Sequence, residues 1–507
     1  MSLLYDGLFY NVSVTKVFVF CAILLLALRL GRFGKRRSQL PLPPGPRGHW
    51  LFGNEFPRPH APRVYAQWAK EYGPLITLRK GGRVYIIICG QQAAIDIMEK
   101  ENAYLVDRPR VIAAGEVMSG DKRILLVRHG ERFRKLRKAL QSQMHLKVVE
   151  AYEPIQARNA RNVILDILEK PDRHIEHTKR YAASFIMTLA YGKQTPTSYS
   201  DPEVQEVNKC LFRLGRAMTP GFYLVDAYPF LRFIPGFLSE PKRFHQEELA
   251  LFRSQLDSVR ERMRRNEAQP CFAKYLIERQ GELELSDDEL AYLAGSMFGA
   301  GSDTTAAALS IVIMAAALFP DMQRHVQEQL DAVVGRERMP SFGDMDALTA
   351  VTAFYLETYR WRPVSVGGFP HRATKDIVYG QYCIPEGATV VGNHWGIGKD
   401  PEFYPEPESF IPSRWITETG EINEKIKYFN FGFGRRVCPG QHVANRSVFI
   451  NTAFLLWAFN ISQDPSSPID SLAFTDTANT HPLPFRVKFE PRIPNLREIV
   501  ENAAKEA

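Results

Sequence analysis

A single cysteine in a glycine-rich loop is the most informative feature of this sequence. The loop runs from Phe431 to Gly440, and Cys438 stands two residues after Arg436 and just before an expected helix. Nearby cationic charge and a helix N-terminus both favour a thiolate over a thiol, and glycines let the backbone approach a large flat partner. Such a thiolate could be the axial ligand of a haem iron. The alternative is a buried free cysteine in a turn.

An acid and an alcohol stand side by side in the middle of an expected long helix. Asp303 and Thr304 follow Ala300-Gly301-Ser302. The Thr304 hydroxyl could donate to the carbonyl of Ala300, compete with the helix ladder and open a local bend. A bend with these two groups suits a site that holds dioxygen and passes protons. The alternative is a packing groove of small residues with a solvated Asp303.

A third pattern is the pair Glu357 and Arg360, which lie three residues apart. On a helix they share one face, and a local ion pair there contributes about 0.2–0.5 kcal/mol. This spacing is common, so alone it indicates little.

Together the three stretches resemble the cytochrome P-450 family. Phe-x-x-Gly-x-Arg-x-Cys-x-Gly at 431–440, Ala-Gly-x-Asp-Thr at 300–304 and Glu-x-x-Arg at 357–360 occur in that family's order and rough spacing. The resemblance extends from the N-terminal apolar segment to about Arg492, and the cysteine loop is highly specific. This loop and the segment 367–371 also resemble the fungal secondary-metabolism branch of the family.

The resemblance implies haem b as cofactor, with Cys438 as the axial ligand of its iron. Residues at the cofactor would be Cys438, Arg436, Arg137, His371, Phe431, Gly434 and Gly440. Arg137, Arg436 and His371 would meet the haem propionates, because buried carboxylates need charge-assisted donors. For His371 the alternative is a structural histidine. Phe133 stands where the family more often has Trp, so an indole N–H donor to a propionate is missing.

Two further residue roles follow from the same resemblance. The stretch 407–415 is similar to the family's meander segment, where Arg414 would complete a buried triad with Glu357 and Arg360. Asp303 and Thr304 would be catalytic and would deliver protons during oxygen activation. The implied enzyme is an oxidoreductase, a haem-thiolate monooxygenase that inserts one atom of O2 into a lipophilic small molecule, with hydroxylation as the default, in secondary-metabolite biosynthesis.

Electrons would come from outside the chain. Gly432-x-Gly434 and Gly299-x-Gly301 lack the third glycine of a dinucleotide-binding fingerprint. The resemblance implies NADPH as the indirect source, through NADPH–cytochrome reductase, with cytochrome b5 as a further candidate partner. Arg435 and basic residues within 132–138 could meet an acidic partner.

The resemblance also places substrate-facing residues and leaves two alternatives open. The substrate-facing regions would be about 108–127, 211–237 and 364–368, which are largely apolar and suit a lipophilic molecule. One alternative is a haem-thiolate isomerase or dehydratase that does not use O2, which the intact Asp303-Thr304 pair disfavours. The other is a haem-binding sensor without turnover.

The elements that must position these residues are mainly helical. Ser286 and Glu289 form a capping box that predicts a helix from there to Phe319, with Pro320 as the stop. Another helix is expected from about Gln441 to Phe459. A hairpin is expected between Gly73 and Cys89, and short strands follow Thr374. The predicted fold class is α+β, mainly α-helical, with the resemblance implying the cytochrome P-450 fold with small β-sheets and one N-terminal transmembrane helix.

The first residues predict a membrane anchor. An apolar segment extends from Leu8 to Leu28, and 21 residues at about 1.5 Å each would span a hydrocarbon core of about 30 Å. Five Lys or Arg residues follow it, which places them on the cytosolic side. We therefore expect an anchor and basic flank at 1–37, a proline-rich hinge at 40–46 and a catalytic domain at 38–507. The expected location is the endoplasmic reticulum membrane, single-pass, with the catalytic domain in the cytosol.

Composition excludes several other classes of protein. The 507 residues are 45% hydrophobic and 24% charged, as in an ordinary globular protein, so disorder is excluded. Lys and Arg total 64 against 56 Asp and Glu, and this diffuse +8 gives no reason to expect nucleic acid as a partner. Six cysteines without a CxxC pair exclude a disulfide framework and a cysteine-rich zinc module. His174 and His177 lack a third ligand cluster and are expected at the surface.

Overall fold

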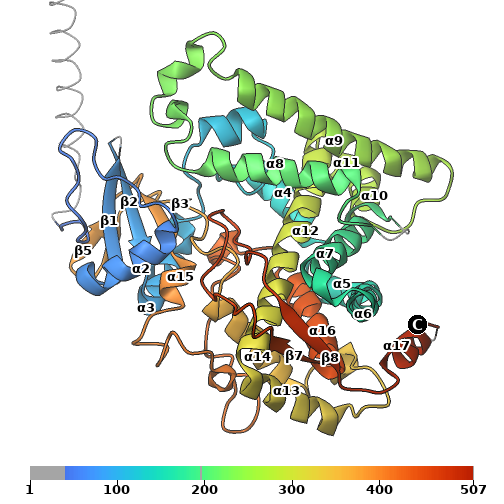
Figure 1. The fold of residues 1–507 in the computed structure, drawn as a ribbon. Coiled ribbons are helices and arrows are strands. Elements are labelled where there is room, and N and C mark those ends of the chain that lie inside the picture. Colours follow the sequence, from blue (N-terminus) through green and yellow to red (C-terminus); the bar gives the residue numbers. More distant parts are fainter. Residues whose placement is uncertain (1–39, 81, 194–196, 506–507) are drawn as a thin grey trace, which may run out of the picture.

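The computed structural model describes residues 40–80, 82–193 and 197–505. A large helical region stands beside a smaller part built around a β-sheet, and one long helix runs through the centre of the helical region (Figure 1). This is the mainly helical architecture that the sequence predicted. The proposed anchor, residues 1–37, lies outside the described residues.

The central helix is α12, Asp287–Leu318. Its start is the predicted capping box, because the Glu289 N–H donates to Ser286 Oγ at 3.3 Å and the Ser286 N–H donates to Glu289 Oε2 at 2.9 Å. Pro320 opens the next helix, α13 (Pro320–Val333), so the predicted stop is also confirmed. Among the described residues α12 alone is long and apolar enough to cross a membrane, but 78% of its most apolar window is buried inside the protein. It is therefore the core helix of the fold.

Small residues let neighbouring helices approach α12 closely. A Cβ added at Gly301 would lie 2.5 Å from Ile186 of α7, and one at Gly295 would lie 2.3 Å from the ring of Phe252 on α9. Both distances are well inside normal contact, so these glycines are needed for the packing. The packing alternative considered for the small residues of this helix is thus correct for Gly301.

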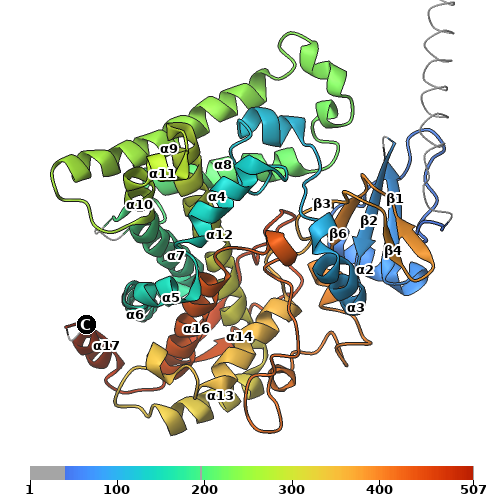
Figure 2. The same ribbon diagram turned by 180° about the vertical axis from the view of Figure 1, so that it is seen from behind.

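Most of the other helices lie around α12, whereas α2 (Ala61–Tyr72), α3 (Gln91–Ala94) and α15 (His394–Ile397) lie beside the β-sheet (Figures 1 and 2). The helices that contact α12 most are α7 (His174–Tyr191), α9 (Ser239–Arg264), α10 (Phe272–Glu278), α14 (Thr349–Trp361) and α16 (Gln441–Ala458). The remaining helices are α4 (Glu131–Gln141), α5 (Leu146–Val149), α6 (Glu153–Glu169), α8 (Pro202–Met218), α11 (Gln280–Leu283) and α17 (Leu496–Lys505). The predicted helix after the cysteine loop is α16, one residue shorter than expected because Phe459 begins a strand.

The β-strands form one four-stranded sheet and two small pairs. The sheet has the order β1-β2-β6-β3, and β1 (Leu75–Lys80) and β2 (Arg83–Ile88) are the predicted hairpin. β6 (Thr389–Gly392) runs parallel to β2, and β3 (His371–Arg372) pairs antiparallel to β6. The two-stranded pairs are β4 (Ile377–Tyr379) with β5 (Tyr382–Ile384), and β7 (Phe459–Gln463) with β8 (Val487–Pro491).

The proline-rich segment 40–46 is fastened to this sheet region. The carbonyl of Pro44 accepts the Thr77 N–H at 2.8 Å, and that of Pro41 accepts the Cys383 N–H at 2.9 Å. The Asn54 side-chain amide donates to the carbonyl of Pro46 at 2.9 Å. The expected hinge is therefore part of the folded body from residue 41 onward.

Candidate functional site

One face of α12 opens onto an internal space at the acid–alcohol pair. Ala300 is exposed and Thr304 is partly exposed, although nearly all of the C-terminal half of the helix around them is buried. Residues i and i+4 share a helix face, so both line the same space. The Thr304 hydroxyl donates to the carbonyl of Ala300 at 2.8 Å, which is the predicted bond. The helix continues unbroken through this point.

Cys438 lies in the loop directly before α16. Its N–H donates to the carbonyl of Phe431 at 2.7 Å, which closes the loop. The sulfur is deep in the protein, yet the side chain remains partly accessible because it faces internal space. Burial raises the pKa of the thiol, while the Gly440 N–H and the charge of Arg137 lower it, and the net direction is upward.

This balance corrects the sequence-based expectation of a free thiolate. The two favourable influences exist, but the cation beside the sulfur is Arg137 of α4 and desolvation outweighs both. A metal ion bonded to the sulfur would reverse the balance, since a coordinating thiol is deprotonated outright.

Other residues of the cysteine loop pack it against the rest of the protein. Gly434 has a φ of +48°, its N–H donates to Glu99 Oε1 at 2.9 Å, and a Cβ there would lie 2.4 Å from Asn102. Phe431 packs edge-on against Tyr359 with ring centroids 5.6 Å apart. Gly440 is the N-cap residue of α16, and a Cβ there would lie 3.9 Å from the Cys438 sulfur. Gly434 therefore serves close packing within the chain, and Gly440 stands next to the sulfur.

Three guanidinium groups gather beside the cysteine loop, from Arg108, Arg137 and Arg436, and we call them the cationic cluster. Burial, with the neighbouring charge of Arg108, lowers the pKa of Arg436 to about 9, and burial lowers that of Arg108 to about 10. Arg436 donates to the carbonyls of Val106 at 2.7 Å and Val127 at 2.8 Å. These carbonyls satisfy N–H groups but supply no negative charge.

Two observations indicate that the cationic cluster accommodates carboxylates that the chain does not supply. The Nε of Arg137 is buried and has no hydrogen-bond partner within the described part of the chain. The neighbouring carboxylate, Asp107, is engaged by Arg128 at 3.1 Å and Arg372 at 3.2 Å. Buried charges are normally paired, so this donor set fits a group that carries propionates and lies against Cys438. Haem b is such a group.

Phe133 takes part in the cationic cluster in a way that the sequence did not indicate. The guanidinium of Arg436 lies over its ring, 3.6 Å from the centroid. This is a cation–π contact, and it positions Arg436. The phenylalanine thus supports the arginine, in place of the N–H donor that Trp would provide.

The His371 ring is buried and hydrogen-bonded to the backbone in this structure. Its Nδ1 lies 2.6 Å from the carbonyl of Leu105, and it is 4% exposed. Burial and the charge of Arg108 hold the pKa of its ring well below the usual value. A neutral ring that donates from Nδ1 has no proton on Nε2 to give to a carboxylate. These contacts favour the structural role over the propionate role.

Glu357 is the centre of a second buried charged group, which we call the Glu357 cluster. Arg360 donates to both carboxylate oxygens at 2.7 and 2.8 Å, and Arg414 Nε donates at 3.2 Å. The structure thus brings the three predicted residues together. It adds two donors that the sequence reasoning did not name, the Trp415 indole N–H at 2.9 Å and the Ile411 N–H at 2.8 Å. Trp415 lies next to Arg414 in the sequence, but nothing in the sequence shows where its indole points.

Asp303 does not point freely into solvent, as the packing alternative supposed. Its Oδ1 accepts from His481 Nε2 at 2.8 Å and its Oδ2 accepts from the Asn479 amide at 3.0 Å. Burial raises the pKa of the carboxyl, but the hydrogen bond and charge of His481, the Asn479 hydrogen bond and the charge of Lys179 together lower it below its usual value. Neither partner was predicted, because they lie more than 170 residues along the chain.

The predicted substrate-facing regions divide into inner and outer residues. Leu211 contacts α12, since a Cβ at Gly299 would lie 3.2 Å from it, whereas the neighbouring Phe212 is 59% exposed. Arg108 is buried in the cationic cluster and is not substrate-facing. Asp226 accepts the backbone N–H groups of Ile112 and Ala113, so it caps the short helix 112–118.

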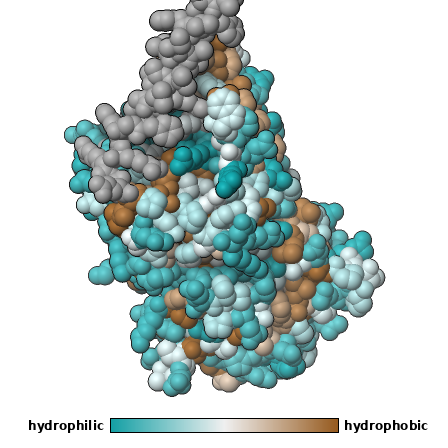
Figure 3. All heavy atoms as spheres, turned by 90° about the vertical axis from the view of Figure 1, so that its left-hand side faces the viewer, coloured by the Kyte–Doolittle hydropathy of each residue, from teal (hydrophilic) through white to brown (hydrophobic). Residues whose placement is uncertain are grey.

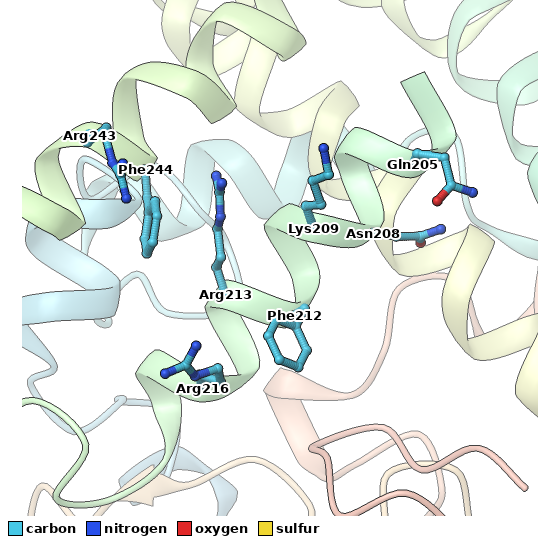
Figure 4. Close-up of a pocket in the computed structure, with 8 residues that line it drawn as sticks. All are labelled: Gln205, Asn208, Lys209, Phe212, Arg213, Arg216, Arg243 and Phe244. Atoms are coloured by element: carbon cyan, nitrogen blue, oxygen red, sulfur yellow. The ribbon is translucent and has the colours of Figure 1, made fainter. Parts of the chain in front are cut away.

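A hollow of about 420 Å³ lies on the outer side of α8 and α9 (Figure 4). Lys209, Arg213 and Arg216 extend from α8 and Arg243 from α9, and these basic side chains do not converge on one point. Arg213 is paired with Glu247 at 2.5 Å, and Arg216 lies over the ring of Phe222 at 4.7 Å. This hollow is therefore a surface groove with internally paired charges, distinct from the site at Cys438.

No second metal centre is present among the described residues, which contain no group of three or more His, Cys, Asp or Glu placed to hold an ion. His174 and His177 are buried at the start of α7, with 2% and 9% exposure, so the expectation of a surface position was wrong. His174 packs edge-on against Phe485, with ring centroids 4.9 Å apart, which explains its burial.

Comparison with known proteins gives the family. The family described as cytochrome P-450 matches residues 43–489. Cytochrome P-450 monooxygenase 64 of Postia placenta is 56% identical over 465 residues, covering 92% of this chain and 94% of that protein. A cytochrome P-450 monooxygenase of Armillaria gallica is 35% identical, covering 96% and 97%, and monooxygenase fogE of Aspergillus ruber is 35% identical, covering 93% and 91%. This chain therefore belongs to the cytochrome P-450 family and is a monooxygenase.

Proposed function

We propose that this enzyme is a haem-thiolate monooxygenase that inserts one oxygen atom into a lipophilic small molecule in secondary-metabolite biosynthesis. The observation that carries the proposal is the cationic cluster beside the accessible face of Cys438. Asp107 contributes a favourable charge to Arg108 and Arg436, but none of the three guanidinium groups forms an ion pair with a carboxylate of the described chain, and two propionates next to a thiolate-bound iron would provide such partners.

Each residue then has a definite task. Haem, when bound through Cys438, supplies the reductive activation of dioxygen and the oxidation of the substrate. Arg137 and Arg436 would hold the propionates, and the Glu357 cluster would keep the proximal side rigid. Thr304 has its hydroxyl proton committed to the carbonyl of Ala300, so its oxygen can accept a hydrogen bond from a group in the internal space. Asp303 is the adjacent carboxyl that can receive and release protons.

A lipophilic substrate is supported by the apolar character of the segments around the site and by the exposed apolar residues near them. Phe222, Leu224, Tyr228, Phe230, Phe233 and Ile234 are all exposed, and Trp50 and Phe52 are 81% and 66% exposed. Arg83 donates to the carbonyl of Asp226 at 2.7 Å, so this segment lies against the β-sheet. On the face that carries this sheet, apolar residues interrupt the polar surface (Figure 3).

We propose that this apolar surface rests on the endoplasmic reticulum membrane, with the catalytic domain in the cytosol. Exposed aromatic residues of this kind suit the region between lipid headgroups and acyl chains. A substrate dissolved in the membrane would then reach the site without crossing water.

The electrons would be delivered from NADPH through a reductase. Arg134, Lys138 and Arg435 are exposed, and none of the three has an ion-pair partner among the described residues. They could meet acidic residues of such a partner, or of cytochrome b5. Arg132 and Lys135 on the same helix are less suited, because they pair with Glu289 at 3.1 Å and Glu284 at 2.6 Å.

The test is expression with a reductase, followed by product analysis against a panel of lipophilic metabolites. The wild-type enzyme should show the carbon-monoxide band typical of thiolate ligation and an NADPH-dependent product that contains oxygen from O2. Cys438→Ser should lose both. Thr304→Ala should keep the band but divert electrons to peroxide, so that product per NADPH falls by roughly tenfold or more.

The outcomes also separate the other candidate functions. A product formed without NADPH or O2 would mean an isomerase or dehydratase. Haem binding without NADPH consumption across the panel would mean a sensor. Product per NADPH at the wild-type level in Thr304→Ala would contradict the role of that hydroxyl.

A further inference from the structure

Asp303, the acid of the acid–alcohol pair, accepts hydrogen bonds from a segment far along the chain, residues 474–482. Residues 474–482 fold back on themselves through a bridge between Phe474 and Pro482. The Thr480 N–H donates to the carbonyl of Val364 at 2.8 Å, which fastens this segment to the 364–368 stretch. The segment is therefore anchored independently of α12.

Two residues of this segment reach Asp303 together. Asn479 and His481 stand two positions apart, and Asn479 lies in a bend of the chain. Both donate to Asp303, one to each carboxylate oxygen, at 3.0 and 2.8 Å. Asn479 is itself oriented, because its Oδ1 accepts from the Ser365 hydroxyl at 2.7 Å.

Asp303 thus faces a titratable imidazole and a neutral amide, and a lysine ammonium lies farther away. His481 and Asn479 belong to the C-terminal segment, and Lys179 of α7 contributes a favourable charge without a hydrogen bond. The side chains of Asp303 and His481 each retain 24% exposure. Water can therefore reach the imidazole while its Nε2 remains bonded to the carboxylate.

We propose that His481 is a positioning residue that keeps Asp303 oriented and restores its proton from solvent during turnover. In this step a hydronium ion of the solvent protonates Nδ1 and becomes water, the Nε2–H bond breaks and the proton passes to Oδ1 of Asp303. The products are a neutral imidazole with its proton on Nδ1 and a protonated carboxyl. Exchange with water returns the imidazole to its first tautomer. Asn479 shares the orienting role but cannot move a proton. The inference rests on the proposed monooxygenase function, because that reaction consumes protons.

The first test uses His481→Gln, which keeps an N–H donor for Asp303 but cannot titrate. We expect it to retain haem and the carbon-monoxide band, to lower product per NADPH by roughly threefold to tenfold, and to show a pH profile of turnover that differs from the wild type's, because glutamine cannot exchange a proton. His325→Gln is the matched control, because His325 is a 66% exposed histidine whose ring also faces a carboxylate, that of Glu328. Wild-type coupling and a wild-type pH profile in His481→Gln would overturn the inference.

The second test measures the contact without turnover. Histidine ring nitrogens are labelled and observed by NMR in the diamagnetic ferrous carbonyl form, and the His481 signals are assigned by their loss in His481→Gln. Asp303→Asn should shift the His481 Nε2 signal, because it replaces the carboxylate that accepts the Nε2–H. An unchanged His481 Nε2 signal in Asp303→Asn would overturn the inference. A shifted Nε2 signal in a protein that forms no oxygenated product would contradict the proposed function instead.

Discussion

Two buried groups of charges in this enzyme differ in whether the chain itself completes them. In the Glu357 cluster, two arginines, an indole and a backbone N–H all converge on one carboxylate, and the other Arg360 N–H groups reach the carbonyls of Gly398, Pro407 and Ser409. In the cationic cluster, Arg108 and Arg436 donate to backbone carbonyls, and the buried Nε of Arg137 has no partner in the part of the chain that the structure describes. The first is a finished structural element, and the second is organised around a ligand.

The difference predicts opposite behaviour on substitution. Removal of the central group of a completed cluster should harm the protein with or without haem. Removal of one arginine from the cationic cluster should matter mainly when haem is bound.

The largest effect is expected for Glu357→Ala. It leaves the buried charges of Arg360 and Arg414 without a carboxylate, and breaking such a pair costs about 3–5 kcal/mol. We expect little soluble protein, a much lower unfolding temperature and loss of haem, measured by thermal unfolding and by the ratio of haem to protein. Glu328→Ala, at a 67% exposed glutamate, is the control. A fully loaded, wild-type-stable Glu357→Ala protein would show that the cluster is dispensable.

A smaller and state-dependent effect is expected for Arg137→Gln. The haem-free protein should be as stable as the wild type, because the lost charge has no carboxylate partner there. Haem should dissociate roughly tenfold to a hundredfold faster, which corresponds to a charge-assisted hydrogen bond of about 1.5–3 kcal/mol. The measurement is transfer of haem to an acceptor apoprotein. Equal stability losses in the haem-free and haem-bound proteins would make Arg137 an ordinary structural residue.

A still smaller effect is expected one turn away on the same helix, at the exposed Arg134. Arg134→Glu should leave haem retention unchanged but raise the reductase concentration needed for half-maximal turnover by roughly threefold, since rim charges act mainly on association. The difference from the wild type should disappear at high salt. Lys209→Glu on α8 is the charge-matched control. A salt-independent defect would indicate that α4 itself had been disturbed.

The smallest effect concerns Lys399, which borders the Glu357 cluster and donates to the carbonyl of Pro407 at 2.9 Å. Burial lowers its pKa to about 8, from 10.5. Between these values the unfolded chain binds more protons than the folded one, so this residue makes stability rise with pH. From pH 8 to pH 10 the unfolding temperature of the wild type should therefore rise relative to that of Lys399→Met. Lys100→Met, at an exposed lysine, should give curves parallel to the wild type.

The sequence predicted features that depend on local patterns. The capping box of α12, the β1–β2 hairpin and α16 each arise from residues that are neighbours along the chain, so their positions were predicted almost to the residue. The bond from Thr304 to Ala300 is also local.

The sequence could not predict features that depend on depth or on distant partners. The backbone N–H of Gly440 favours the Cys438 thiolate as expected, but the nearby cation is Arg137 of α4 instead of Arg436, and burial, a property of the whole fold, decides the direction of the pKa shift. The same holds for Arg108. The sequence placed it among the substrate-facing residues, but its guanidinium donates to the carbonyls of Phe369 and Pro370. The bond between Asp303 and His481 joins residues that no periodicity connects.

The attachment of residues 41–46 to the sheet region bears on the orientation of the enzyme at the proposed membrane surface. A Cβ at Gly45 would lie 2.1 Å from the carbonyl oxygen of Thr77, so the proline segment lies flush on the strand beneath it. The direction in which the chain leaves the body is then set by the sheet. Under the membrane association that we propose, a tether joined to this segment would keep the same side of the catalytic domain facing the bilayer.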